Sequence, residues 1–237
     1  MINKGNIDKL YTKNNDSIKI NYILHTDPVF RRNGIKSSCI SKLNWFNLSW
    51  VNDFIKHVFN IIDFLEIKPY SIEIHPGQSE NGKNNVLAFS KAIKTIHERY
   101  EEKYDSEVKI FIENRTKQYI QDGRDIRSFW TYFKDNYPDL QEKTGIILDI
   151  QQLYTVNKEN FESELLKIPK ECLFGLHIHE RHRTPSGKNI PLNIWEFIAD
   201  KIPDLIENER QFHILPEVHH SKQAEETYKF CKEFLKI

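Results

Sequence analysis

The sequence has little of several features that would mark a specialised class of protein. It holds only three cysteines, Cys39, Cys172 and Cys231, and no C-x-x-C pair. A disulfide scaffold or a structural zinc site built on cysteine is therefore excluded, and a reducing compartment is expected. No apolar run approaches the roughly 18 residues of a membrane span, and residues 1–16 lack the apolar core of a secretory signal. These absences predict a cytoplasmic protein with no membrane partner.

Net charge and glycine are also scarce. The 34 Lys and Arg residues balance the 34 Asp and Glu residues, so no overall basic field would attract nucleic acid. A neutral net charge does not exclude a local basic cleft. The eight glycines form no G-x-x-x-x-G-K-[ST], G-x-G-x-x-G or G-x-S-x-G motif. Nucleotide-binding P-loops, dinucleotide-binding loops and serine hydrolase elbows are therefore excluded.

What the sequence does contain is a regular alternation of two patterns. Six short runs are rich in Ile, Val, Leu and Phe, which is typical of strands buried on both faces: 17–25, 70–75, 108–113, 145–150, 173–179 and 211–217. Between them, apolar residues recur at helical spacing and predict amphipathic helices over 51–65, 89–100, 126–133, 192–205 and 228–235. The aromatic residues of these helices are expected to lie in the core.

Strands that alternate with helices predict a parallel sheet joined by right-handed crossovers. We predict an α/β fold of the (β/α) TIM-barrel type in one domain over residues 1–237, with an open doubly wound sheet as the alternative. Only six strands are evident, and a full barrel needs eight. Residues 1–16 and 30–48 supply the missing strands, or the barrel is incomplete or distorted at its N-terminal strands. The irregular stretch 26–48 is either a functional loop or a missed element.

Each predicted strand carries an acid or a histidine near its C-terminal end. These residues are His25, His75, Glu113, Asp149, His177 and Glu217. In a parallel barrel the C-terminal ends of all strands face one mouth, where buried charges need a compensating cation. Sets of imidazole and carboxylate ligands suit zinc or manganese better than calcium or magnesium. We therefore predict that these six residues bind divalent metal, with one or two ions per chain.

Five segments resemble the xylose-isomerase-like barrels, a superfamily that includes endonuclease IV and the ketose 3-epimerases. They are IEIHPGQ (72–78), IFIENR (110–115), ILDIQQ (147–152), HIHERHRTPSG (177–187) and LPEVHH (215–220). The order Glu113, Asp149, His177, Glu217 is similar to that of the four metal ligands of the epimerases. The resemblance implies that Glu113 and Glu217 are catalytic, and that Asn114, His179 and Arg183 bind the substrate.

The resemblance to endonuclease IV includes its His-Pro-Gly turn, here His75 to Gly77, but it is not complete. Endonuclease IV has a histidine three residues after its Asp ligand, and Gln152 stands at that position here. The later Asp-x-His pair of endonuclease IV has no clear counterpart after His177. The resemblance therefore implies one or two metal ions in this chain rather than three.

Two reactions and one inactive state are compatible with this pattern. In hydrolysis of a phosphodiester bond, His25 and His75 would hold a second metal, Glu217 would orient or deprotonate a water, and the partner would be DNA with a damaged or abasic site. In isomerisation or epimerisation of a small sugar, Glu113 and Glu217 would move the proton, and His25 and His75 would have no assigned task. The third hypothesis is an inactive metal-binding barrel. The sequence does not determine the oligomeric state.

Overall fold

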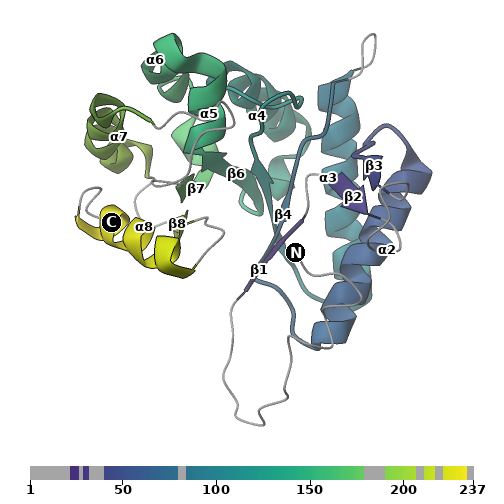
Figure 1. The fold of residues 1–237 in the computed structure, drawn as a ribbon. Helices are drawn as coiled ribbons and strands as arrows, with labels where there is room; N and C mark the ends of the chain where they lie inside the picture. Colours follow the sequence, from purple (N-terminus) through teal and green to yellow (C-terminus); the bar gives the residue numbers. More distant parts are fainter. Residues whose placement is uncertain are drawn as a thin grey trace. The chain divides into compact units, whose positions relative to one another are not determined.

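The computed structural model describes residues 22–26, 29–31, 40–79, 84–178, 190–206, 211–216 and 221–233. The chain divides into two compact units, residues 1–110 and 111–237, and the boundary falls within the strand β5 (Lys109–Glu113). Figure 1 traces the elements along the chain. That the two units form one domain stays a prediction.

The first unit combines two parallel strands with two long helices. β1 (Ile23–His25) pairs with β4 (Ser71–Ile74), and the helices are α2 (Leu48–Leu65) and α3 (Asn85–Tyr104). β2 (Val29–Arg31) and β3 (Ile40–Lys42) pair antiparallel in a sheet of their own. The stretch 30–48 therefore contains a strand, as its composition suggested, but this strand does not join the parallel sheet.

The second unit continues the alternation of strand and helix. Its strands after β5 are β6 (Thr144–Asp149), β7 (Leu173–Ile178) and β8 (His213–Pro216), and the pairs β6–β7 and β7–β8 are parallel. Its helices are α4 (Gly123–Asn136), α5 (Ile150–Asn157), α6 (Phe161–Leu165), α7 (Leu192–Leu205) and α8 (Ser221–Glu233). Short 3-10 turns cover Pro138–Leu140, Lys158–Asn160 and Lys170–Cys172. α5 and α6 were not predicted from the sequence; α5 begins at Ile150, directly after the last residue of β6, without an intervening turn.

The order of the strands decides between the two fold classes left open by the sequence. Among the described residues the main sheet has the order β1-β4-β5-β6-β7-β8, so each strand lies beside the next one along the chain. A doubly wound sheet reverses its order at a switch point, and this sheet does not. The prediction of an α/β fold of the TIM-barrel type, incomplete at six strands in the described part of the chain, is confirmed.

Most apolar residues of the helices are buried as their spacing predicted, but Leu192 and Tyr228, which the spacing also placed on the buried faces, are exposed. In the first unit Trp45 contacts Trp50, Phe54 and Phe89 at ring distances of 5.0–5.3 Å. In the second unit Phe129, Trp130 and Phe133 of α4 are at most 1% exposed. The aromatic residues therefore build the cores, as expected. Within the described ranges, no helix is both long enough and apolar enough for a membrane crossing.

The start of α4 holds two carboxylates close together. Asp122 accepts a hydrogen bond from the backbone nitrogen of Asp125 at 2.9 Å, and Asp125 accepts one from the backbone nitrogen of Gln121 at 3.3 Å. This reciprocal pattern resembles a capping box and fixes the first turn of the helix. Burial raises the pKa of Asp125 to about 6, and the negative charge of Asp122 acts in the same direction.

We expect this raised pKa to make the native state less stable as the pH rises from about 4 to about 6. The native state holds a proton on Asp125 in this range and the unfolded chain does not, so this contribution is complete below the unfolded pKa and is lost above the folded one. Asp125→Asn, which keeps the hydrogen-bond acceptor, should remove this part of the pH dependence. The measurement is urea unfolding between pH 4 and 8, with Asp135→Asn, an exposed position of the same helix, as the control that keeps the wild-type slope.

Candidate functional site

The predicted site residues of the described part lie at the C-terminal ends of their strands. His25 ends β1, His75 follows β4 directly, Glu113 ends β5, Asp149 ends β6, and His177 is the last but one residue of β7. Glu217, which follows β8 in the sequence, lies outside the described residues, as do His179 and Arg183. The roles proposed for these three residues stay predictions.

In the first unit, three side chains of β1 and β4 form what we call the β4 group: His25, Glu73 and His75. The pairing of β1 with β4 sets His25 directly opposite Glu73, and their Nε2 and Oε1 atoms are 3.8 Å apart. The rings of His25 and His75 are 5.3 Å apart. Glu73 and His75 are fully buried, and His25 is exposed. Glu73 was not predicted as a site residue, because it lies two residues before His75, the acid or histidine closest to the end of its strand.

The turn after β4 is fixed by contacts to its backbone. The indole nitrogen of Trp45 donates a hydrogen bond to the carbonyl oxygen of His75 at 3.1 Å. Gly77 has a positive φ of 74°, and a Cβ atom at this position would lie 3.1 Å from Leu43 and 3.2 Å from Trp45. The His-Pro-Gly sequence is therefore a turn packed against Leu43 and Trp45 just after His75.

We expect Gly77→Ala to destabilise the protein by about 1–3 kcal/mol, because the new side chain would have a strained φ and would press on Leu43 and Trp45. The free energy of unfolding from urea titration measures the effect. Ser79→Ala, at an exposed position of the same segment, should change it by less than about 0.5 kcal/mol. Equal stability of the two variants would contradict the packed-turn interpretation.

In the second unit, Glu113, Asp149 and His177 form what we call the β6 group. All three are at most 1% exposed. The Oε2 atom of Glu113 is 3.4 Å from Nδ1 of His177, and the pairing of β6 with β7 sets Asp149 opposite His177. Facing residues on paired strands point to the same side of the sheet. The guanidinium group of Arg115 lies 3.7 Å from the other oxygen of Glu113 and is half-buried.

Hydrogen bonds hold the backbone around Asp149 in place. One carboxylate oxygen, Oδ1, accepts from the backbone nitrogens of Gln151 and Gln152 at 2.8 and 2.9 Å, so Asp149 is the N-cap of α5. The buried side-chain amide of Asn114 accepts a hydrogen bond from the backbone nitrogen of Asp149 at 2.7 Å and donates one to the backbone carbonyl oxygen of Asp149 at 3.3 Å. The side chain of Gln152 accepts from the nitrogen of Thr116 at 3.0 Å. Asn114 thus orients Asp149, while its predicted role in substrate binding stays a prediction.

The double role of Asp149 can be separated by substitution. Asp149→Asn keeps a cap, because asparagine caps as well as aspartate, and Asp149→Ala loses it. We therefore expect the alanine variant to be about 1 kcal/mol less stable than the asparagine variant in urea unfolding of metal-free protein. If Asp149 is also a metal ligand, both variants should bind zinc at least about 10-fold more weakly than the wild type in calorimetric titration.

Within the β6 group, the separation of Glu113 and His177 fits two ligands of one divalent cation. Two ligands of one tetrahedral zinc ion, each about 2.0–2.1 Å from the metal, lie about 3.4 Å apart. The separation of Glu113 and His177 is 3.4 Å, which is longer than an ordinary hydrogen bond between nitrogen and oxygen. Buried acids and imidazoles of this kind are borderline to hard ligands that suit zinc or manganese. In the described part of the chain, some His and Glu side chains have ligand atoms close enough together to hold a divalent metal.

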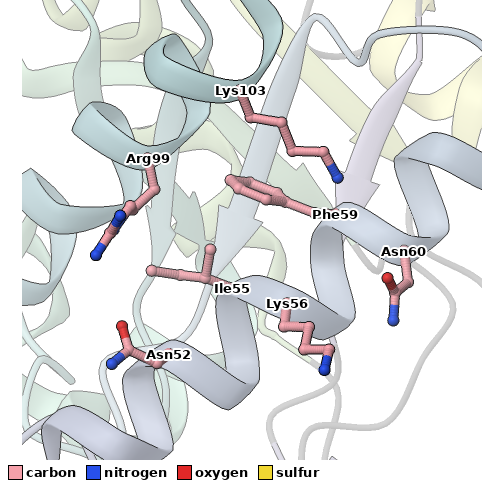
Figure 2. Close-up of a pocket in the computed structure, with 7 residues that line it drawn as sticks. All are labelled: Asn52, Ile55, Lys56, Phe59, Asn60, Arg99 and Lys103. Atoms are coloured by element: carbon pink, nitrogen blue, oxygen red, sulfur yellow. The ribbon is translucent and has the colours of Figure 1, made fainter.

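A surface pocket of different character is lined by residues of α2 and α3 (Figure 2). None of these acids and histidines is part of its lining. Its volume is about 220 Å³, and Lys56, Arg99 and Lys103 surround the apolar side chains of Ile55 and Phe59. Arg99 pairs with Glu102 at 3.0 Å, and Lys103 pairs with Asp63 at 2.5 Å. Because Arg99 and Lys103 are paired with acids and no predicted site residue lines the pocket, the two acid and histidine groups are the stronger candidates for the functional site.

The structure is similar in fold to several solved structures. It matches an AP endonuclease, family 2, from Brucella melitensis with a TM-score of 0.56 at 8% identity, over 90% of this chain and 78% of the other. A xylose isomerase domain protein from Alicyclobacillus acidocaldarius matches with a TM-score of 0.52 at 12% identity, over 82% and 75% of the two chains.

An L-ribulose 3-epimerase matches with a TM-score of 0.53 at 11% identity, over 79% of this chain and 68% of the other. No protein-family profile matches the sequence, and no curated protein matches it either. At these identities the comparisons establish the fold, and the predicted resemblance to the xylose-isomerase-like barrels is confirmed at that level.

Proposed function

Because the chain has the fold of the xylose-isomerase-like barrels, we propose that it is a divalent-metal-dependent hydrolase that cleaves phosphodiester bonds in DNA with a damaged or abasic site. The observation that supports this reaction best is the β4 group. His25 and His75 are metal-binding residue types additional to those of the β6 group, and their rings are 5.3 Å apart. Hydrolysis with two metal ions uses such a second set of ligands, whereas a one-metal sugar isomerase does not.

In this proposal the protein residues have separate tasks. Glu113, Asp149, His177 and Glu217 would hold one zinc or manganese ion, and His25 and His75 would help to hold a second. Bound metal of this kind activates water and neutralises the charge that develops on a phosphoryl oxygen. Asp149 would bind the metal through Oδ2, because its other carboxylate oxygen, Oδ1, already accepts two backbone hydrogen bonds. Glu217 would orient or deprotonate the attacking water.

The substrate would be recognised mainly through its phosphate groups. Arg183 carries a planar guanidinium that pairs with phosphate oxygens, and we propose it with His179 and Asn114 as the substrate-binding residues. Arg115 is a further candidate, because its half-buried guanidinium lies 3.7 Å from Glu113. The chain has no net charge to attract DNA as a whole, so binding would depend on such local cations.

A sugar isomerase or epimerase is the second candidate. It is favoured by the order Glu113, Asp149, His177, Glu217, which resembles the ligand set of the ketose 3-epimerases. Here Glu113 and Glu217 would act as general base and acid on a small sugar. An L-ribulose 3-epimerase is among the similar structures, at a TM-score of 0.53. This reaction assigns no task to His25 and His75, and for that reason we place it second.

Metal quantification and an activity assay test the proposal. We expect the protein purified without chelator to hold two zinc or manganese ions per chain and to cleave an oligonucleotide at an abasic site. His177→Ala should lower the metal content and reduce cleavage at least about 100-fold, which is the range for losing a group that assists the reacting atoms. His57→Ala removes an exposed histidine of α2 and serves as the control.

The other hypotheses predict different results. One ion per chain, no cleavage, and exchange of a ketose proton with solvent deuterium would establish the isomerase instead. Absence of bound metal and of both activities would favour the inactive barrel. Cleavage that persists at the wild-type rate after metal removal would contradict all three metal-based readings.

A further inference from the structure

A loop with two cations and no acid follows β5 in the second unit. Residues 114–121, which we call the β5–α4 loop, include Arg115 and Lys117 and contain neither Asp nor Glu. The loop begins directly after Glu113, the last residue of β5, and leads to Asp122, the N-cap of α4. In barrels of this type the loops after the C-terminal strand ends form the substrate site. The positive charge of this loop is therefore placed beside a member of the β6 group.

Backbone hydrogen bonds anchor the β5–α4 loop. The nitrogen of Arg115 donates to the carbonyl oxygen of Ile120 at 2.9 Å, and the nitrogen of Gln118 donates to the carbonyl oxygen of Arg115 at 3.0 Å. The side chain of Gln152 in α5 accepts from the nitrogen of Thr116 at 3.0 Å. Both backbone groups of Arg115 are thus bonded within the loop. A side chain on a backbone fixed in this way loses less conformational entropy when it binds a ligand.

The guanidinium group of Arg115 has donors left for a ligand. Its Nη1 atom lies 3.7 Å from Oε1 of Glu113, whereas a charged hydrogen bond is about 2.7–2.9 Å long. Within the described ranges this ion pair is the one polar interaction of the side chain. A guanidinium carries five N–H donors in a planar fork that matches two oxygens of a phosphate group.

A second arginine of the same unit shows that the burial of Arg115 is unusual for a pair of this length. The Nη2 atom of Arg124 is also 3.7 Å from a buried carboxylate, that of Asp122, but the side chain of Arg124 is 74% exposed. The side chain of Arg115 is 35% exposed. A charge withdrawn from water without hydrogen bonds is costly, and a bound anion would offset that cost. The side chain is still open enough for a ligand to reach it.

We infer that Arg115 binds a phosphoryl oxygen of the substrate, and that the β5–α4 loop is the phosphate-binding element of the site. The inference deepens the proposed function and rests on it, because it names the group of the substrate that this loop recognises. That group is a diester in DNA and a monoester in a sugar phosphate, and both present the same anionic oxygens. Because Arg115 also faces Glu113, the bound phosphate would lie beside the β6 group.

Calorimetric titration of the purified full chain with inorganic phosphate tests this inference. The wild type should bind phosphate, and Arg115→Ala should bind it at least about 10-fold more weakly, the loss expected for one charged hydrogen bond. Arg115→Lys keeps the charge without the planar fork and should have an intermediate affinity. Arg124→Ala removes an arginine at the same distance from a carboxylate and should keep the wild-type affinity.

Three results would overturn the inference: no binding to the wild type, equal affinity of Arg115→Ala and the wild type, or equal losses in Arg115→Ala and Arg124→Ala. If Arg115→Ala does not fold, the comparison of Arg115→Lys with the wild type gives the same test. The metal content of the folded variants should equal that of the wild type. A parallel loss of metal and phosphate would show instead that Arg115 only positions Glu113.

Substrate analogues distinguish the two sources of the phosphate. An abasic oligonucleotide with an uncharged methylphosphonate at the lesion should bind the wild type more weakly than the phosphodiester does. If the source is a sugar phosphate, a phosphorylated ketose should bind more tightly than the unphosphorylated ketose. In both arms Arg115→Ala should lose most of the discrimination between the charged and the uncharged compound, because the group that senses the charge is missing.

The outcomes separate this inference from the proposed function. If phosphate binding depends on Arg115 and the wild type does not cleave abasic DNA, the inference stands and the proposed reaction is wrong. If the wild type cleaves abasic DNA and Arg115→Ala cleaves it with an unchanged KM, the role of Arg115 is wrong and the hydrolase proposal stands.

Discussion

The cost of removing charge from water is the constraint on which the rest of this structure depends. Glu73, His75, Glu113, Asp149 and His177 are all at most 1% exposed, and they lie on strands of Ile, Leu and Phe. Each of these side chains could be hydrated on the surface, where acids are usually found. Their burial is favourable only where hydrogen bonds, a positive charge or a bound metal compensates the lost hydration. A divalent cation supplies positive charge in a small volume, so the burial of these side chains agrees with the metal hypothesis that the resemblance suggested.

Several polar side chains hold the candidate ligands in place. Asn114 pairs with the backbone of Asp149, and Gln152 with the backbone of Thr116. Trp45 bonds to the carbonyl oxygen of His75. Such supporting contacts set the direction of a ligand, and metal affinity depends on them. They also give a structural role to Gln152, which stands where endonuclease IV has a histidine. Its side chain joins α5 to the segment after β5.

The fold alone does not choose between the reactions, because similar barrels act on different substrates. An AP endonuclease and an L-ribulose 3-epimerase resemble the chain about equally, with TM-scores of 0.56 and 0.53. What separates the two readings is the number and kind of side chains that could bind metal. His25 and His75 therefore say more about the reaction than the overall similarity does.

The sequence by itself determined the six main strands, the long helices, the aromatic cores and five candidate ligands at strand ends, because strand burial and helical spacing are properties of local composition. Tertiary structure decided what depends on neighbours distant along the chain. The strand order excluded a doubly wound sheet, and the strand in 30–48 pairs antiparallel outside the main sheet. Glu73 lies opposite His25 because of the register between β4 and β1. Registry between strands and the capping role of Asp149 arise from long-range hydrogen bonds and local backbone geometry that residue types do not specify.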